Sequence, residues 1–140
     1  MEQLSHQKLP MEVKDAYWVF AFREKGIYPK SVNPGKWLIF VSVKDIDAIW
    51  MKIRKATEDG LLGDSAKSST AKDNGMSRNK NSKVICVYTY DWKDKNDVFR
   101  IRSVLRELGI TWEIGYKTDE DTIKGKYALT GNLSICKYRA

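Results

Sequence analysis

The sequence predicts an α+β domain in which two helices pack on one face of a five- or six-stranded sheet. Several short segments are rich in β-branched and aromatic residues, only two segments show helical spacing, and 140 residues make one domain. Two helices cannot cover both faces of so wide a sheet. The other face is therefore expected to stay partly open, and a ligand is expected there.

The chain opens on a mainly polar stretch, residues 1–10, and residues 1–14 are predicted to be an N-terminal tail, which leaves residues 15–140 for a single domain. The segment Ala16–Phe22 is apolar on both faces and is typical of a covered strand. Pro and Gly residues then supply turns before a second predicted strand, residues 36–42. The chain thus begins with two consecutive strands.

Residues 46–58 carry apolar side chains at helical spacing. Asp45 is a suitable N-cap and Gly60 a natural stop, so this segment is predicted to be an amphipathic helix. Residues 66–70 are predicted to form a short strand. The following segment, residues 71–83, is basic and shows no periodicity, which indicates a mobile loop.

Four further elements complete the predicted order. They are a strand at 84–90, a helix that Asp97 caps and Gly109 ends, a strand at 110–117, and a closing strand at 133–138. A turn or short helix is expected to start at Asp119. We find no internal repeat and no domain linker.

The chain is basic, with 25 Lys and Arg against 18 Asp and Glu, and a formal net charge of +7. Such an excess favours nucleic acid, phosphorylated ligands or anionic surfaces as partners. The alternative is an ordinary Lys-rich domain whose charge serves solubility.

The cysteine and histidine content limits the compartment and the chemistry. Cys86 and Cys136 form no paired motif and no secretory signal opens the chain, so a reduced, cytoplasmic location is expected. No apolar run approaches the roughly 20 residues of a membrane span. The lone His6 excludes His-rich metal sites and Ser-His or Cys-His pairs, and we expect no metal and no cofactor.

The strongest candidate for phosphate binding is the segment after Gly60 and Gly63, which contains Lys67, Ser69 and Thr70. A cation followed by hydroxyl donors suits a phosphate group, although the order is not that of a Walker A loop. The alternative is a solvated polar strand and loop.

Further cations are candidates for the same role. Arg102 and Arg106 are four residues apart and share a helix face, and a guanidinium can bind phosphate through two hydrogen bonds. Lys117 and Tyr116 lie where a predicted strand ends. A solvated helix face and an acidic helix cap are the alternatives for these two groups.

Five tryptophans are many for 140 residues. Trp18, Trp50 and Trp112 are expected in the core. Trp37 follows a turn and Trp92 lies in a polar segment, so these two are expected to be reachable and to stack on a base. The alternative is that they too are core or rim residues.

Several segments together resemble the basophilic-leukaemia-expressed protein family, also labelled phosphothreonine lyase domain proteins. The resemblance covers about residues 16–127. It is carried by Gly35-Lys-Trp37-Leu, Thr57 to Thr70, Val84 to Asp91, Asp97-Val98 with Leu105 to Gly109, and Tyr116-Lys-Thr-Asp119. It implies a fold similar to translation initiation factor 4E, a curved and mostly antiparallel sheet with helices on its convex side.

The resemblance also suggests two activities that the residues can be tested against. A phosphothreonine lyase needs a base and cations on the phosphate. Lys67 is the candidate base, with Arg102, Arg106 and Lys117 on the phosphate, but the histidine of such lyases is missing and Tyr88 would have to replace it. Cap binding would use Trp37 and Trp92 for stacking, with Glu113 or Asp91 at the base edge.

These observations lead to one hypothesis and two alternatives. The hypothesis is non-catalytic binding of a nucleotide, a short RNA or another phosphorylated ligand in a basic, aromatic-lined pocket, which Tyr88 and Tyr116 help to orient. One alternative is a phosphothreonine-lyase-like enzyme or a phosphoesterase with Lys67 as base. The other is a protein-interaction module that uses the basic loop 71–83.

Overall fold

The computed structural model describes residues 7–73, 81–120 and 136–140 of the chain. In chain order the elements are a 3-10 helix Pro10–Glu12, β1 Trp18–Phe22, β2 Gly35–Ser42, α1 Ile46–Glu58, β3 Ser65–Ser69, β4 Ser82–Thr89, α2 Lys95–Glu107, β5 Gly115–Thr118 and β6 Tyr138–Arg139. No helix in these ranges is long and apolar enough to cross a bilayer.

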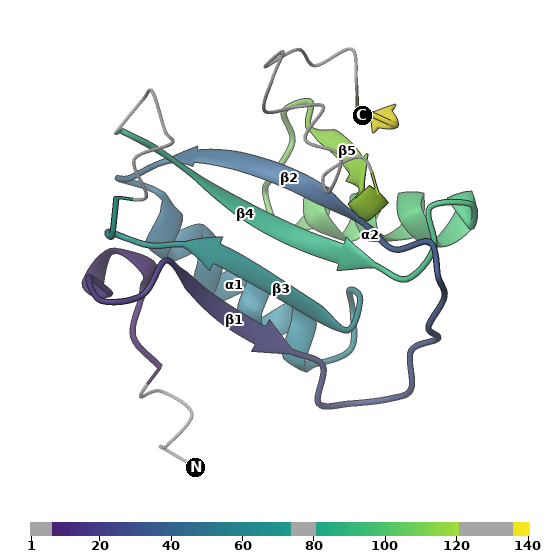
Figure 1. Ribbon diagram of the computed structural model, residues 1–140, viewed down its shortest axis with the longest axis horizontal. Helices are drawn as coiled ribbons and strands as arrows, with labels where there is room; N and C mark the ends of the chain where they lie inside the picture. The colour runs from purple at the N-terminus through teal and green to yellow at the C-terminus, as the bar shows by residue number, and fades with distance from the viewer. Residues whose placement is uncertain (1–6, 74–80, 121–135) are drawn as a thin grey trace.

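The six strands form one sheet in the order β1-β3-β4-β2-β5-β6, and every neighbouring pair is antiparallel. Both helices lie behind the sheet in the view of Figure 1, so one face is covered and the other faces the viewer. The predicted fold class is therefore confirmed. We call the face without helices the open face.

The two long central strands, β2 and β4, show why the face that packs on the helices is buried and apolar. Successive side chains of a strand point to opposite faces. Trp37 and Ile39 of β2 pair with Val87 and Ile85 of β4, and all four side chains are fully buried against the helices. The intervening residues of both strands consequently point to the open face.

Helix α1 has the bounds that its spacing predicts. Ile46, Trp50 and Ile53 are fully buried and form its inner stripe. Gly60 follows the helix with φ +79°, a conformation that glycine adopts without strain, and its N–H donates to the Thr57 carbonyl. Spacing and stop signal agree here, so the helix was predicted in full.

Helix α2 begins earlier than predicted. Its N-cap is Asp94, whose carboxylate accepts a hydrogen bond from the Asp97 N–H at 3.2 Å, so the prediction of Asp97 as the cap is wrong. Asp94 and Asp97 are both residues preferred at an N-cap, so the sequence does not distinguish them. Asp97 instead places a negative charge in the first turn of the helix, where the helix dipole favours it.

Strand β5 is shorter than the predicted strand at residues 110–117. Ile110 and Ile114 are buried, but they belong to the connection from α2, and Trp112 is 41% exposed rather than in the core. The guanidinium of Arg102 takes the carbonyls of Ile110 and Trp112 as acceptors, which a strand would have used in its ladder. Half of the predicted closing strand at 133–138 lies outside the described residues, and in the described half β6 begins only at Tyr138.

The chain before β1 is not simply a tail. The 3-10 helix packs on α1, because the Met11 N–H donates to the Asp47 carboxylate at 3.0 Å and Val13 is buried. The predicted loop 71–83 falls mostly outside the described residues, and its last two positions belong to β4. Cys86 and Cys136 are both free thiols.

Replacing Gly63 with alanine is expected to destabilise the domain. A Cβ at this position would lie 2.1 Å from the backbone oxygen of Tyr88, so β4 or the connection to β3 would have to move. Overpacking of this kind costs about 1–3 kcal/mol of unfolding free energy. Urea unfolding measures it, with Leu61→Ala, at an exposed side chain nearby, as the control. A Gly63→Ala protein as stable as the wild type would contradict the contact.

Candidate functional site

The open face carries a lysine at its centre. Lys67 of β3 pairs with Phe20 of β1 on one side and with Cys86 of β4 on the other. Its ammonium nitrogen lies 3.9 Å from the centre of the Trp18 ring, a cation-π contact. Lys67 is only half-buried, so its charge is within reach of a ligand on this face.

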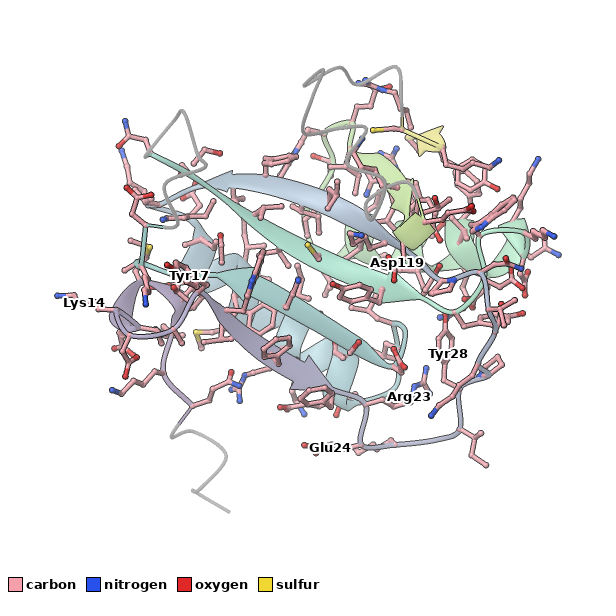
Figure 2. All side chains as sticks on the ribbon, in the orientation of Figure 1. Lys14, Tyr17, Arg23, Glu24, Tyr28 and Asp119 are labelled. Atoms are coloured by element: carbon pink, nitrogen blue, oxygen red, sulfur yellow. The ribbon has the colours of Figure 1, made fainter. Side chains whose placement is uncertain are left out.

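A second row of the open face holds two more lysines. Lys36 of β2 pairs with Tyr88 of β4 and with Lys117 of β5. The ammonium of Lys36 lies 3.0 Å from a carboxylate oxygen of Asp119 and 5.9 Å from the centre of the Tyr88 ring. Figure 2 shows Asp119 on the near side of the sheet, away from the helices.

These two lysines are deeply placed, since Lys36 is 7% exposed and Lys117 is 5% exposed. Burial of a charge costs free energy unless an opposite charge or hydrogen bonds compensate it. Asp119 provides that compensation for Lys36. The open face therefore has a charged floor beside the more accessible Lys67.

A pocket of about 340 Å³ adjoins this face where β4 ends. Ser65 and Tyr88 belong to both, because they point to the open face and also line the pocket. The connection between β1 and β2 forms the other wall with Lys30 and Ser31. Hydroxyl groups, one ammonium and the Asp64 carboxylate thus line a space that shares Ser65 and Tyr88 with the lysine-bearing face.

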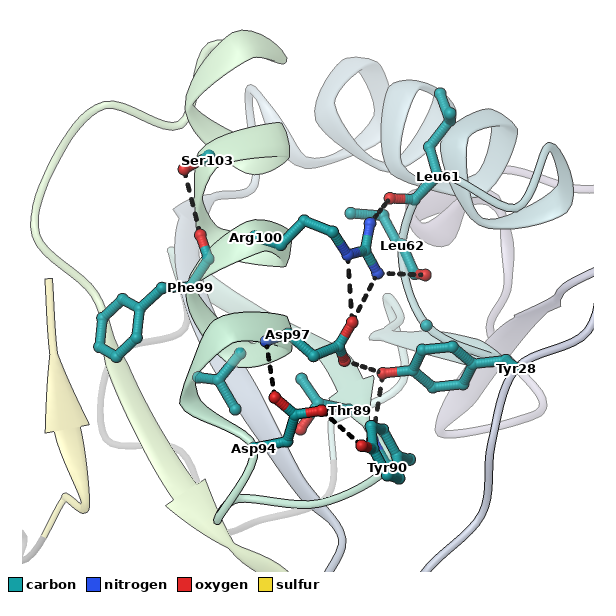
Figure 3. Close-up of polar contacts among 12 residues, drawn as sticks. Tyr28, Leu61, Leu62, Thr89, Tyr90, Asp94, Asp97, Phe99, Arg100 and Ser103 are labelled. Carbon is teal, nitrogen blue, oxygen red and sulfur yellow. Dashed lines mark hydrogen bonds and ion pairs between the residues drawn. The ribbon is translucent and has the colours of Figure 1, made fainter.

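A hydrogen-bond network lies beside the pocket, and Tyr90 belongs to both (Figure 3). The hydroxyl of Tyr28 donates to Asp97 at 2.5 Å and accepts from the Tyr90 N–H at 3.2 Å. Arg100 donates to the other Asp97 oxygen at 3.0 and 3.1 Å and to the Leu61 carbonyl at 2.9 Å. The β1–β2 connection, the α1–β3 connection and the start of α2 are thereby tied together.

The titratable groups beside Lys67 stay protonated at neutral pH. Burial raises the pKa of the Cys86 thiol to about 11, although Lys67 and Lys36 oppose the shift. Burial also raises the pKa of Tyr88. The thiol is a poor nucleophile in this state and the phenol is a hydrogen-bond donor rather than a base.

Four of the predicted ligand-binding residues do lie on the open face. Lys67, Tyr88 and Lys117 were described above, and Ser69 is the fourth. The Ser69 hydroxyl accepts from the Val84 N–H at 2.9 Å and donates to the Val84 carbonyl at 3.2 Å, so it already stabilises the pairing with β4.

Thr70 and Tyr116 lie elsewhere. Thr70 is fully buried and its hydroxyl donates to the Ala16 carbonyl. Tyr116 is fully buried on the helix-covered face, where its hydroxyl lies 2.6 Å from that of Thr89. Neither side chain can reach a ligand on the open face. The alternation of the strand explains Tyr116, since its neighbour Lys117 takes the outward position.

The two arginines of α2 belong to the covered side of the molecule. Arg102 is 2% exposed and donates to the backbone carbonyls of Ala140, Ile110 and Trp112 at 2.8–3.1 Å. Each of the three guanidinium nitrogens already donates to a backbone carbonyl, so the phosphate-binding role of Arg102 stays a prediction that its burial does not favour. Arg106 is exposed but bonds the Thr111 carbonyl at 3.3 Å, behind the sheet.

The expected stacking pair is not formed by Trp37 and Trp92. Trp37 is fully buried and its indole N–H donates to the Val98 carbonyl of α2, so its exposure was predicted wrongly. Trp92 is half-buried, and the ammonium of Lys137 lies 4.1 Å from its ring centre. Trp18, predicted in the core, is instead a half-buried residue of the open face.

Sequence reasoning also missed residues. Lys36, Trp18 and Phe20 lie on the open face but were not predicted there. In β2 the polar Lys36 was the one signal available, because Trp37 to Val41 are all apolar and only the structure shows that their burial alternates. In β1 it was absent, because the aromatic run is apolar on both faces. Within the described residues no group of three His, Cys, Asp or Glu side chains could hold a metal ion.

Comparison with known families gives one match over most of the chain. The model of the family described as basophilic leukemia-expressed protein Bles03 matches residues 29–122. The matched range includes β2 to β5 and both helices. All three lysines of the open face lie inside it.

Solved structures of initiation factor 4E proteins share the fold. A schistosome eIF4E, solved with m7GpppG and 4E-BP, superposes with a TM-score of 0.70 at 18% identity over 99% of this chain and 78% of its own. C. elegans eIF4E-3, solved with the 4E-binding protein Mextli and cap analog, gives 0.68 at 18% identity, with the same coverage. Ascaris suum eIF4E-3, solved with an m2,2,7G cap, gives 0.59 at 19% over 83% and 69%. The chain therefore has an eIF4E-like fold.

Proposed function

The chain belongs to the family of basophilic leukemia-expressed protein Bles03, and with its eIF4E-like fold as the premise we propose that it binds a phosphate-bearing nucleotide on the open face without converting it. The observation that carries the proposal is the gathering of Lys67, Lys36 and Lys117 on the face that neither α1 nor α2 covers. Proteins of this fold have been solved with cap nucleotides, which carry phosphates.

The arrangement suits an anionic ligand. Lys67 offers an accessible charge. Lys36 and Lys117 lie buried beside it, and Asp119 offsets the charge of Lys36. Tyr88, whose phenol remains protonated, can donate a hydrogen bond to a phosphate oxygen at the edge of the pocket. The phosphates would lie between Lys67 and Tyr88, with the base toward Trp18.

The groups around Lys67 support binding without chemical conversion of the ligand. Elimination or hydrolysis of a phosphate ester needs a base or an activated nucleophile. The neighbouring Cys86 thiol has a pKa of about 11 and the Tyr88 pKa is raised as well, so neither is deprotonated at neutral pH. Lys67 remains the one candidate base for the phosphothreonine-lyase-like alternative.

Isothermal titration with GTP, ATP, m7GTP and a phosphothreonine peptide tests this function. We expect a nucleotide to bind, and we expect Lys67→Ala to weaken it about ten- to hundredfold, because a charge-assisted hydrogen bond is lost. Lys52→Ala, an exposed lysine of α1 behind the sheet, is the matched control and should bind normally.

Two results would contradict the proposal. If no nucleotide binds, or if Lys67→Ala and Lys52→Ala bind alike, the open face is not the site. Chromatography of the ligand after incubation decides between binding and catalysis. Unchanged ligand is expected, whereas released phosphate that depends on Lys67 would favour the enzyme.

A further inference from the structure

The open face extends well beyond the three lysines, and its outer part is aromatic. Phe20 and Phe22 of β1 are 46% and 61% exposed, and Phe40 of β2 is 57% exposed. Trp18 lies on the same face, one same-face position before Phe20. Exposed aromatic side chains that gather on one face indicate an interaction site.

The pattern of β1 is the reverse of that of an ordinary covered strand. Its inward residues are Val19, which is half-buried, and the small Ala21, which is 2% exposed, while the large rings of Phe20 and Phe22 point outward. The two rings stack with 6.0 Å between their centres and 12° between their planes. Packing within the domain does not account for these rings, since they are turned away from the helices.

Cations accompany the aromatic residues along this edge. Lys67 covers the Trp18 ring at 3.9 Å, and Lys72 lies 4.4 Å from the ring centre of Tyr17, which is 45% exposed. None of the outward residues of β1 and β3 is acidic. A purely apolar partner would gain nothing from these charges, whereas a polyanion with flat rings would use both features.

We propose that the open face binds single-stranded nucleic acid, whose bases stack on Trp18, Phe20 and Phe22 while its phosphates follow the lysines. This rests on the proposed function and extends it from one nucleotide to a strand. Binding sites for single strands combine a positive track with aromatic platforms, and every base can stack. Same-face residues of β1 recur about every 7 Å, so the rings form a row of separate contacts.

The experiment is a length series. Fluorescence anisotropy with labelled oligo(U) of two, four and six nucleotides, and titration with UMP, measure how affinity depends on length. We expect the hexamer to bind at least about tenfold more tightly than UMP, since each stacked base adds affinity. The logarithm of the affinity should also fall with the logarithm of the salt concentration, by roughly 0.7 per phosphate contacted.

The double variant Phe20→Ala/Phe22→Ala isolates the new contact. It should lose the gain with length and leave GTP binding unchanged, because both rings are exposed and neither lies in the pocket. Trp112→Ala removes an exposed ring from the α2–β5 connection and is the matched control. Thermal unfolding confirms that each variant is folded. Oligo(dT) of the same lengths separates a preference for RNA from single-strand binding in general.

The inference and the proposed function can fail separately. Lys67-dependent GTP binding without a gain from length would overturn the inference alone. Failure of GTP and of every oligonucleotide would overturn both. Self-association that disappears in the double variant, with no oligonucleotide bound, would show the aromatic face to be a contact between copies and would overturn the inference. A hexamer that binds the double variant as it binds the wild type would do the same.

Discussion

Trp37→Ala is expected to lower the free energy of unfolding by about 3–5 kcal/mol, the cost of removing a large aromatic side chain from a packed core. Trp37 is fully buried between β2 and α2, and its ring meets Phe99 and Tyr116 edge to face at 5.8 and 5.3 Å. The substitution also leaves the Val98 carbonyl without its indole donor. Urea unfolding followed by circular dichroism measures the change.

Trp37→Phe separates the two contributions, because it keeps most of the ring but not the N–H. We expect this variant to be intermediate in stability. Where Trp37→Ala remains folded, it should bind nucleotide as the wild type does, since the ring lies on the covered face. Weaker binding by a folded Trp37→Ala protein would restore the stacking role that the sequence predicted for it.

Arg102→Met is the other large effect, with about 3 kcal/mol of unfolding free energy expected to be lost, because a buried acceptor without a donor costs about 1–3 kcal/mol. Three carbonyls depend on this guanidinium, those of Ala140, Ile110 and Trp112. Burial already lowers the arginine pKa, which is the price of placing the charge there. Methionine keeps the length of the apolar stem.

Arg106→Met on the same helix is the control. Its guanidinium is exposed and makes one long hydrogen bond to Thr111, so a change within about 0.5 kcal/mol is expected. Denaturant midpoints of the two variants, measured side by side, test the assignment. Equal stability for both would mean that Arg102 does not hold the α2–β5 connection and the C-terminus together.

Hydrophobic patterning was sufficient to predict the elements whose sequence is compatible with only one type of secondary structure. The stripe of Ile46, Trp50 and Ile53 predicted α1 to its last residue, and the apolar runs of β2 and β4 predicted the central strands. It failed at β5, where Ile110 and Ile114 are buried in a connection that Arg102 of α2 holds through hydrogen bonds. Hydrogen bonds from a side chain to the backbone of another segment leave no periodic signal in the sequence of that segment.

The candidate site was only partly predictable for a related reason. A sequence shows that Lys67 or Lys117 is charged, but only the register shows that both point to the same face as Lys36. Arg102 and Trp37 have the residue types of ligand-binding groups, yet both are committed to the core. For these residues the decisive quantity is burial, which depends on the packing of α2 on the sheet.

The strand order has a consequence for how the chain folds. β4 lies between β3 and β2 at the centre of the sheet, although it is the fourth strand along the chain. Until residues 82–89 have been synthesised, β2 and β3 have no partner between them, and the rows that carry Lys36 and Lys67 are not joined. Pairings of such large sequence separation slow folding, and they expose strand edges in the nascent chain. Arrival of β4 therefore joins the rows of Lys36 and Lys67, whereas α2 and β5, which bring further core residues and Lys117, follow later in the chain.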